Sequence, residues 1–264
     1  MGSSDDRDEA RQAIPFVRKG LTSQSLYFSI EEVQSRMQLQ HPDALDLRYT
    51  RTMMGFLAFL PAPDAIAAVG LGGGSLVKFC HRHLPKARID VAEINPHVIA
   101  LRTTFRVPPD SRRLRVVEAD GAQFIRAAEH RYDVLLLDAF GPAGLPRTLS
   151  SQRFYDDCLD VLKPGGLLVA NLHSAARDFD ACVERVERSF VGGALVVTDR
   201  EAGNSIVFAR RGGRLPAMST VRPRGFDPGA WRALGGAFAR IDTALARRDA
   251  PAAAAPLADC RSAP

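Results

Sequence analysis

Residues 64–84, DAIAAVGLGGGSLVKFCHRHL, decide the fold class of this chain. Residues 64–69 are almost wholly apolar, which predicts a buried strand, and residues 75–84 predict a helix. Four glycines, Gly70, Gly72, Gly73 and Gly74, lie between the two elements. Glycine lets the backbone turn sharply and approach a ligand closely. A buried strand, a glycine-rich turn and a helix, in this order, begin the repeating unit of a parallel sheet.

The same alternation of strand and helix continues to about residue 210. Apolar strands that alternate with amphipathic helices indicate a parallel sheet covered on both faces. About six residues join the final two strands, too few for a parallel crossover, so these two must run antiparallel. The predicted fold is α/β, a doubly wound, Rossmann-like seven-stranded sheet with an antiparallel last strand, and it looks like that of S-adenosylmethionine-dependent transferases. Further strands are predicted at 88–93, 114–118, 132–138, 167–172, 194–198 and 205–209, and helices at 96–105, 122–129, 150–162 and 175–190.

The flanking segments divide the chain into four predicted parts. Residues 1–20 are charged and aperiodic, which predicts a disordered N-terminus. Residues 21–60 predict a small β-element, with strands at 25–30 and 36–40, followed by a helix at 50–60. The sheet domain occupies 61–212, and 213–264 form a basic tail that ends in a low-complexity, disordered segment. One amphipathic helix is predicted over 229–248, packed on the domain or on a partner subunit, from the helical spacing of Trp231, Leu234, Phe238, Ile241 and Leu245.

Composition argues against several classes of function. The chain has 264 residues, of which 46% are hydrophobic and 25% charged, as in ordinary globular proteins. No apolar stretch reaches the about 18 residues of a membrane span, and the polar N-terminus does not predict a secretory signal. The four cysteines are widely spaced, which favours a reducing cytoplasm over a disulfide framework or a zinc site. The excess of 35 basic over 30 acidic residues is mild, so we do not expect nucleic-acid binding.

An acidic residue stands where a ribose-binding side chain is expected. Glu93 ends the predicted strand 88–93, 23 positions after Gly70. In doubly wound sheets a carboxylate at this place faces the cofactor ribose and accepts its two hydroxyls. A dinucleotide fingerprint reads GxGxxG, and Ser75 stands here in place of the third glycine. The pattern therefore favours a nucleoside of the adenosylmethionine type over a dinucleotide.

Two further carboxylates follow strands at the same edge of the sheet. Asp120 and Gly121 come just after strand 114–118. The aspartate can accept a hydrogen bond from the adenine amino group, cap the next helix, or do both. Gly121 keeps the backbone open. Asp138 ends the apolar strand 132–138 and is placed at the mouth of the crevice. It can cap the strand end, or hold and deprotonate an amine nucleophile.

In order and spacing, these motifs resemble those of the polyamine aminopropyltransferases, the family typified by spermidine synthase, over about residues 25–210. Tyr49 falls where that family has a tyrosine lining the substrate site. The order and the spacing together carry the resemblance, and no single motif does. The motifs are GLGGG at 70–74, VAEI at 91–94, Asp120-Gly121, the run from Tyr132-Asp133-Val134 to Asp138, Gly141-Pro142, Phe154-Tyr155 and LKPGG at 162–166.

The resemblance implies a site and a reaction. Glu93 would hold the ribose and Asp120 the adenine of S-adenosylmethionine or its decarboxylated form, and no metal would be needed. Asp138 and Tyr49 would be catalytic, with Asp138 orienting and deprotonating an amine acceptor that attacks the carbon beside a sulfonium. The family forms dimers and tetramers, so we expect a homodimer. The implied nucleoside-binding residues are Gly70, Gly72, Gly73, Gly74, Glu93, Ile94, Asp120, Gly121 and Asp138.

Three positions depart from the family pattern. The family carries an aspartate in the glycine loop, where Gly73 or a neighbour stands here, and a second acid where Gly141 stands. Thr50 replaces a histidine or glutamine after the tyrosine. Each lost charge-assisted contact is worth about 1.5–3 kcal/mol. We therefore expect a diverged member that is inefficient at spermidine synthesis.

Three functions remain open from the sequence. The first is a spermidine synthase-like transferase that acts on an amine with a sulfonium nucleoside donor. The second is a methyltransferase that uses intact S-adenosylmethionine on an unidentified acceptor. The third is a non-catalytic paralogue, which the retention of Glu93, Asp120 and Asp138 disfavours. The acid-free loop at 70–74 is the feature that separates the first two.

Overall fold

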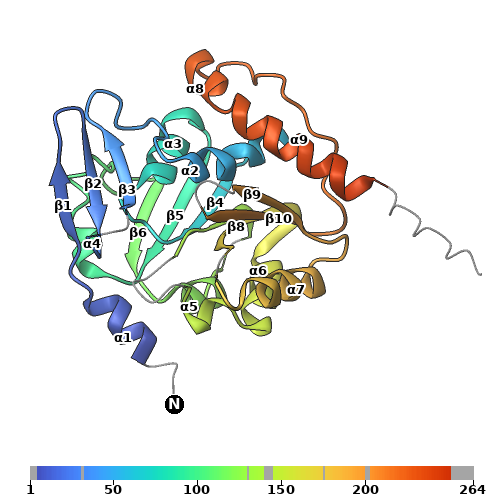
Figure 1. Ribbon diagram of the computed structural model, residues 1–264, viewed down its shortest axis with the longest axis horizontal. Helices are drawn as coiled ribbons and strands as arrows, with labels where there is room; N and C mark the ends of the chain where they lie inside the picture. Colours follow the sequence, from blue (N-terminus) through green and yellow to red (C-terminus); the bar gives the residue numbers. More distant parts are fainter. Residues whose placement is uncertain are drawn as a thin grey trace, which may run out of the picture.

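The computed structural model describes residues 5–30, 33–129, 131–139, 145–174, 176–199 and 203–250. Within these ranges the main sheet has seven strands in the order β6-β5-β4-β7-β8-β10-β9 (Figure 1). Strands β4 to β8 are parallel, and β10 runs antiparallel to both β8 and β9. The predicted doubly wound sheet with an antiparallel last strand is therefore confirmed. The strands are β4 (Ala65–Val69), β5 (Arg88–Glu93), β6 (Leu114–Glu118), β7 (Tyr132–Leu137), β8 (Leu162–His173), β9 (Leu195–Asp199) and β10 (Asn204–Arg210).

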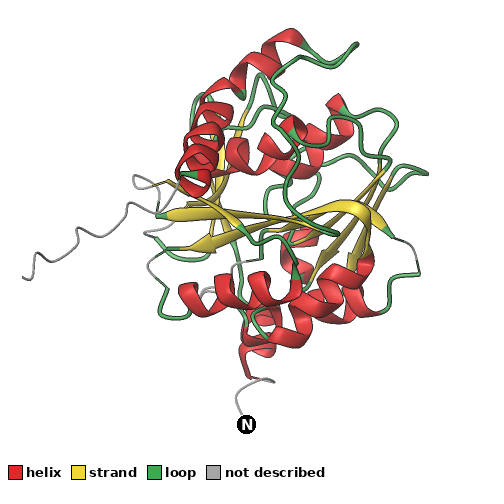
Figure 2. Ribbon diagram, turned by 90° about the vertical axis from the view of Figure 1, so that its right-hand side faces the viewer, coloured by secondary structure: helices red, strands yellow, loops and turns green. Residues whose placement is uncertain are grey.

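Helices cover both faces of this sheet, as the edge-on view in Figure 2 shows. Successive strand residues point to opposite faces, so Ala67 and Ala68 of β4 belong to different core clusters. One cluster packs against α3, and the other packs against α5, α6 and α7. Because both faces of the sheet are buried, the strands are apolar throughout and do not alternate between apolar and polar residues. The helices are α3 (Ser75–His83), α4 (Pro96–Ala100), α5 (Gly121–Arg126), α6 (Gln152–Val161), η2 (Arg147–Leu149) and α7 (Phe179–Ser189).

Two elements of this domain differ in extent from their predictions. The helix predicted at 96–105 is regular only over α4. It continues as turns with hydrogen bonds such as that from the Leu101 N–H to the Val98 carbonyl at 3.0 Å, and the turns end at Arg106, which has a positive φ of 53°. Strand β8 begins at Leu162, where we predicted a sharp turn over 163–166. The extra residues are absorbed by an irregularity in its pairing with β7.

A small antiparallel sheet, β1-β2-β3, precedes the main one. Its strands are β1 (Phe16–Lys19), β2 (Ser23–Tyr27) and β3 (Val33–Gln38), and a helix α1 (Asp5–Gln12) stands before them. The prediction of disorder over 1–20 is wrong for these elements. Strand β1 is ordered by main-chain pairing with β2, and α1 is held by tertiary hydrogen bonds. Contacts of these two kinds do not require a regular spacing of apolar residues, so the sequence shows none. The helix predicted at 50–60 is α2 (Arg48–Met53) followed by the 3-10 helix η1 (Met54–Ala58).

The C-terminal segment packs against the main sheet domain. We predicted one helix over 229–248, and the structure has two, α8 (Pro228–Ala233) and α9 (Gly235–Asp249). The break falls at Leu234, just before Gly235 and Gly236, which are weak helix formers. Trp231, Phe238 and Ile241 are buried in the same core cluster as the sheet, which confirms the apolar face predicted for this segment. The disorder predicted after it concerns residues 251–264, which lie outside the described residues, and the predicted domain boundaries stay predictions.

Candidate active site

A cavity of about 310 Å³ opens where β4, β5, β6 and β7 end. These are the carboxyl ends of parallel strands, the edge at which open α/β sheets bind ligands. The size suits a small organic molecule. Most of the predicted site residues line this cavity: Tyr49, Gly70, Gly72, Glu93, Ile94, Asp120, Gly121 and Asp138.

Gly70 is required by its contact with the end of β7. Its φ is 95°, and a side-chain Cβ at this position would lie 2.2 Å from the carbonyl oxygen of Asp138. The Gly70 N–H donates to the carbonyl of Ala92 at 2.8 Å. The turn after β4 is thus pressed between the ends of two neighbouring strands, and only glycine fits there.

Gly73 and Gly74 do not line the cavity, contrary to the prediction. A Cβ on Gly73 would lie 2.6 Å from Ser35 Oγ and 3.0 Å from a ring carbon of Phe105. Gly74 has a left-handed φ of 67° at the N-terminus of α3, and its Cβ would lie 2.4 Å from a methyl group of Val107. Both glycines therefore serve the packing of the loop against its neighbours.

The Glu93 carboxylate is buried beneath the glycine loop. One oxygen accepts the Leu71 N–H at 2.8 Å, and the other accepts the Asn95 N–H at 2.9 Å. Burial raises the pKa of Glu93, and these backbone hydrogen bonds oppose the rise because they favour the ionised form. The backbone N–H groups of Gly72 and Ile94 also hydrogen-bond to this carboxylate, so four backbone donors hold it in place.

Asp120 and Gly121 both contribute to a helix start. Asp120 Oδ1 accepts the Gln123 N–H at 2.9 Å and caps α5, so the predicted capping role is confirmed. The side chain also lines the cavity. A Cβ on Gly121 would lie 2.3 Å from Val69 Cγ1, so this glycine allows α5 to pack closely on β4. The sequence predicts only that Gly121 keeps the backbone open.

The Asp138 carboxylate accepts a hydrogen bond on each oxygen. Tyr49 Oη donates to Oδ2 at 3.2 Å, and Asn171 Nδ2 donates to Oδ1 at 2.9 Å. Asn204 Nδ2 in turn donates to Asn171 Oδ1 at 3.0 Å, which fixes the direction of the Asn171 amide. Burial raises the pKa of Asp138, and the bonds from Asn171 and Tyr49 oppose the rise. Burial and the neighbouring Asp138 raise the pKa of Tyr49 well above its usual value, so Tyr49 stays a donor.

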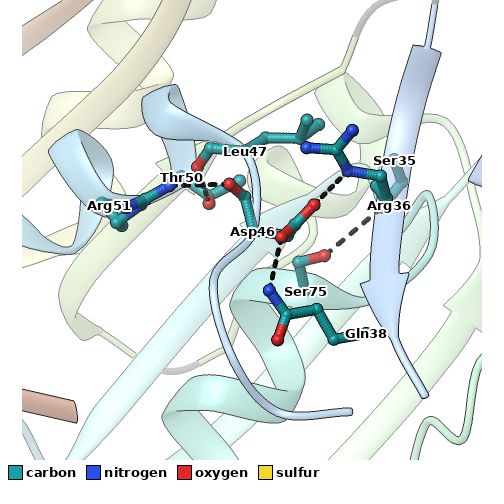
Figure 3. Close-up of polar contacts among 8 residues, drawn as sticks. All are labelled: Ser35, Arg36, Gln38, Asp46, Leu47, Thr50, Arg51 and Ser75. Atoms are coloured by element: carbon teal, nitrogen blue, oxygen red, sulfur yellow. Dashed lines mark hydrogen bonds and ion pairs between the residues drawn. The ribbon is translucent and has the colours of Figure 1, made fainter. Parts of the chain in front are cut away.

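A polar network joins β3 to the segment around the start of α2, the helix that carries Tyr49 (Figure 3). Asp46 accepts from Arg36 and, at 2.7 Å, from Gln38 Nε2, both on β3. Its carbonyl accepts from Arg51 Nη2 at 2.7 Å. Beside this network, the hydroxyls of Ser35 on β3 and Ser75 on α3 lie 3.3 Å apart. The small sheet is therefore attached both to the segment that carries Tyr49 and to the helix after the glycine loop.

Sequence reasoning missed several side chains of the cavity wall. Asn171 and Asn204 lie on strands β8 and β10, and Arg48 begins α2. Arg48 Nε pairs with the buried Asp199 at 3.0 Å. Arg7 comes from α1, in the segment predicted to be disordered. Asn171 is a polar residue near the end of an apolar run, and this was a signal visible in the sequence. No feature of the sequence marks Arg7. Gly141 lies outside the described residues.

A Rossmann-like sheet with a ligand cavity at its carboxyl edge defines a class that includes the nucleoside-dependent transferases. Within that class the Spermine/spermidine synthase domain profile matches residues 46–178, and the chain belongs to this family of transferases. It is 37% identical over 187 residues to the polyamine aminopropyltransferase of Neisseria meningitidis serogroup A, covering 70% of this chain and 71% of the relative. It is 36% identical over 188 residues to that of Chromobacterium violaceum, covering 71% and 72%. The predicted family is confirmed.

Solved structures share the fold. A probable spermidine synthase from Corynebacterium glutamicum matches with a TM-score of 0.66 at 20% identity, over 84% of this chain and 91% of that one. Human methyltransferase-like protein 13 in complex with SAH matches with a TM-score of 0.57 at 25% identity, over 81% and 98%. A spermidine synthase in complex with the transition state analogue AdoDATO matches with a TM-score of 0.53 at 19% identity, over 83% and 78%.

None of the described helices is long and apolar enough to cross a membrane. In the same part of the chain, no group of three or more histidine, cysteine, aspartate or glutamate side chains is placed to hold a metal ion.

Proposed function

We propose that this protein binds a sulfonium nucleoside in the cavity and transfers an alkyl group from it to an amine. One observation carries the proposal: a buried carboxylate, Asp138, is held by Tyr49 and Asn171 in the same cavity as Glu93 and Asp120. Two acids at the nucleoside end and one oriented acid at the reacting end match a cationic donor and an amine acceptor.

At the nucleoside end, Glu93 takes the ribose and Asp120 the adenine. The Glu93 carboxylate is fixed by Leu71 and Asn95 before any ligand arrives, so little freedom is lost when it accepts the ribose hydroxyls. Ile94 follows Glu93 and offers an apolar surface to the base. The relatives crystallised with SAH and with AdoDATO support a ligand of this kind in this fold.

At the reacting end, Asp138 orients the acceptor. Asp138 takes a proton from the acceptor ammonium, which frees the lone pair of the amine. This lone pair attacks the carbon beside the sulfonium, the carbon–sulfur bond breaks, and its electron pair neutralises the sulfur. The raised pKa of Asp138 makes it a better base than a surface aspartate, and Tyr49 keeps it aimed into the cavity. The main contribution of the protein is positioning.

The family favours decarboxylated S-adenosylmethionine as donor, with transfer of an aminopropyl group to an amine. We propose that this chain is a diverged member that performs the reaction inefficiently. The loop at 70–74 carries no acid to bind the donor ammonium, and Ser35 and Phe105 occupy the space beside Gly73. A missing contact of about 1.5–3 kcal/mol lowers affinity at least tenfold. Homodimer assembly and a cytoplasmic location stay predictions.

A second candidate is methyl transfer from intact S-adenosylmethionine. The same loop favours it, because a loop without an acid does not repel the carboxylate that the intact donor retains. The N-terminus of α3 has no side-chain cap, and Leu76 and Val77 of its first turn line the cavity. A non-catalytic paralogue is the third candidate, and the oriented Asp138 disfavours it.

Calorimetric titration with S-adenosylmethionine, its decarboxylated form and methylthioadenosine tests the proposal. We expect all three to bind, and Glu93→Ala to abolish binding because the ribose loses its acceptor. A clear preference for the decarboxylated donor would exclude methyl transfer, and a preference for the intact donor would exclude aminopropyl transfer. Binding of none of the three would leave only the non-catalytic candidate, and unchanged affinity in Glu93→Ala would refute the ribose assignment.

A further inference from the structure

The N-terminal helix α1 forms part of the wall of the nucleoside cavity. Arg7 and Ala10, three residues apart on one face of α1, both line it. Arg7 also lines a second, smaller hollow beside Ile94, Ala119 and Asp120, so it lies at the end of the cavity assigned to the base and ribose. Figure 1 shows α1 near the start of the chain, below the small sheet.

Asn95 attaches α1 to the main domain. Its Nδ2 donates to the carbonyls of Ala10 at 2.9 Å and Ala13 at 2.7 Å. The Oδ1 of the same amide accepts the His97 N–H at 2.9 Å and caps α4. Asn95 is buried and lies two residues after Glu93, the last residue of β5. Its side chain therefore connects the end of β5 to α1, which contributes to the wall of the cavity.

Helix α1 is held in place by polar rather than apolar contacts. Its described side chains are intermediate or exposed, and none belongs to the hydrophobic core clusters. Arg11 pairs with Glu118, but both side chains are largely exposed, and such a pair contributes little. A helix of eight residues does not form by itself in water. Docking of α1 therefore depends on polar contacts rather than on burial of apolar surface.

We propose that Arg7 is a donor-binding residue, and that α1 closes over the nucleoside with the Arg7 guanidinium against the adenine. A planar guanidinium stacks well on an aromatic base, while Ile94 supplies an apolar surface in the same part of the cavity. Because α1 contributes to the wall of the cavity, ligand binding and helix docking strengthen each other by the same factor. The inference rests on the proposed function, and it adds a residue and an ordering step to it.

Titration of Arg7→Ala with the same three nucleosides tests the contact. We expect affinity to fall about tenfold for all three alike, because they share the adenosine that Arg7 covers. Glu9→Gln is the matched control, since Glu9 is an exposed charge on α1 that lines neither hollow, and its affinities should equal those of the wild type. Wild-type affinity in Arg7→Ala would overturn the contact, whereas failure of the wild type to bind any nucleoside would overturn the proposed function as well.

Asn95→Asp tests the closure separately. The aspartate keeps the oxygen that caps α4 but loses the amide that donates to Ala10 and Ala13. We expect methylthioadenosine to slow amide hydrogen exchange over residues 7–13 in the wild type. In Asn95→Asp we expect this slowing to be lost and affinity to fall, with α4 still formed. Equal exchange rates in the wild type with and without methylthioadenosine would overturn the closure.

Discussion

The amide of Asn171 determines how the Asp138 carboxylate is held. Of the two bonds to the carboxylate, the one from Asn171 is the shorter, at 2.9 Å against 3.2 Å from Tyr49. Asn204 restricts the amide to one orientation, because it donates to the Asn171 oxygen and leaves the nitrogen facing Asp138. Two asparagine amides in series therefore support the single carboxylate of Asp138.

We predict that Asn171→Ala lowers kcat and moves the acid limb of the pH–rate profile to higher pH. Hydrogen bonds to an ionised carboxylate lower its pKa, so removing this donor lets burial raise the pKa of Asp138 further. Turnover needs the unprotonated carboxylate, so activity is then lost at a higher pH than in the wild type. The expected fall in kcat is about ten- to a hundredfold, measured by steady-state kinetics across the pH range.

Two variants on β10 control this experiment. Asn204→Ala should shift the limb in the same direction but less, because Asn171 loses its orientation and keeps its bond to Asp138. Ser205→Ala should leave the profile unchanged, because the Ser205 hydroxyl donates to Thr198. An unshifted limb in Asn171→Ala would contradict the role given to Asp138.

The acidic residues of the site could be predicted from sequence because each follows a strongly apolar strand. Glu93, Asp120 and Asp138 are visible for this reason, and all three line the cavity. Asn171 lies inside an apolar run and interrupts it by one residue, which is a weaker signal. Sequence reasoning assigns Gly73 to the ligand because loop glycines look alike in sequence, although its neighbours in space are Ser35 and Phe105.

At the scale of elements, the C-terminal helix α9 packs closely against the 3-10 helix η1 at Gly55. A Cβ on this residue would lie 2.2 Å from Ile241 Cδ1 of α9, and Ile241 is fully buried. The 3-10 helix η1 thus packs against α9 at a position where a side chain has no space. Neither a glycine inside an apolar helix-like run nor an isoleucine far along the chain predicts this contact.

We predict that Gly55→Ala lowers the free energy of unfolding by about 1–3 kcal/mol, because the added methyl group overpacks the contact with α9. Ile241→Val removes the Cδ1 atom and should cost about 0.5–1.5 kcal/mol by itself. The double variant should be less destabilised than the sum of the two, as measured by urea unfolding. Additive effects would show that the two residues are not coupled.

Gly235→Ala is the matched control for this cycle. Gly235 begins α9 and is exposed, and a Cβ added there would meet no atom of the described residues within 4 Å. Alanine is the better helix former, so this variant should equal or exceed the stability of the wild type. The contrast separates a packing clash from a general effect of replacing glycine.

Element types could be predicted better than element ends. Apolar runs of strand length identified each strand of the main sheet, since burial on two faces needs such runs. The start of β8 depends on pairing with β7, which is a tertiary contact. Helix α1 and strand β1 bury little apolar surface, so their sequences show no regular spacing of apolar residues from which they could be predicted.

At the scale of the whole molecule, the C-terminal segment is part of the main core. Trp231 is buried, its Nε1 donates to the carbonyl of Thr220 at 3.0 Å, and its ring packs against Phe226 and Phe238. This cluster is continuous with the sheet side chains. The length of the chain suggests a domain with an appendage, and composition cannot reveal that the appendage covers one face of the sheet.

We predict that tryptophan fluorescence and far-ultraviolet circular dichroism follow one urea transition. The chain has a single tryptophan, so fluorescence reports on the C-terminal segment, whereas circular dichroism reports on all helices and strands. A shared core makes the two unfold together. Trp231→Phe should remove the fluorescence transition and identify its source. A fluorescence midpoint at lower urea would show that α8 and α9 detach first.

The pair of asparagines behind Asp138 also has a consequence for synthesis of the chain. Asn204 begins β10, the last strand to leave the ribosome among those described, and it faces Asn171 only when β10 pairs with β8 in one register. A shift by one residue would turn Asn204 to the opposite face. A nascent chain that has reached residue 199 already carries Glu93, Asp120 and Asp138. The Asp138 carboxylate acquires its support from the two asparagines only when the final hairpin closes.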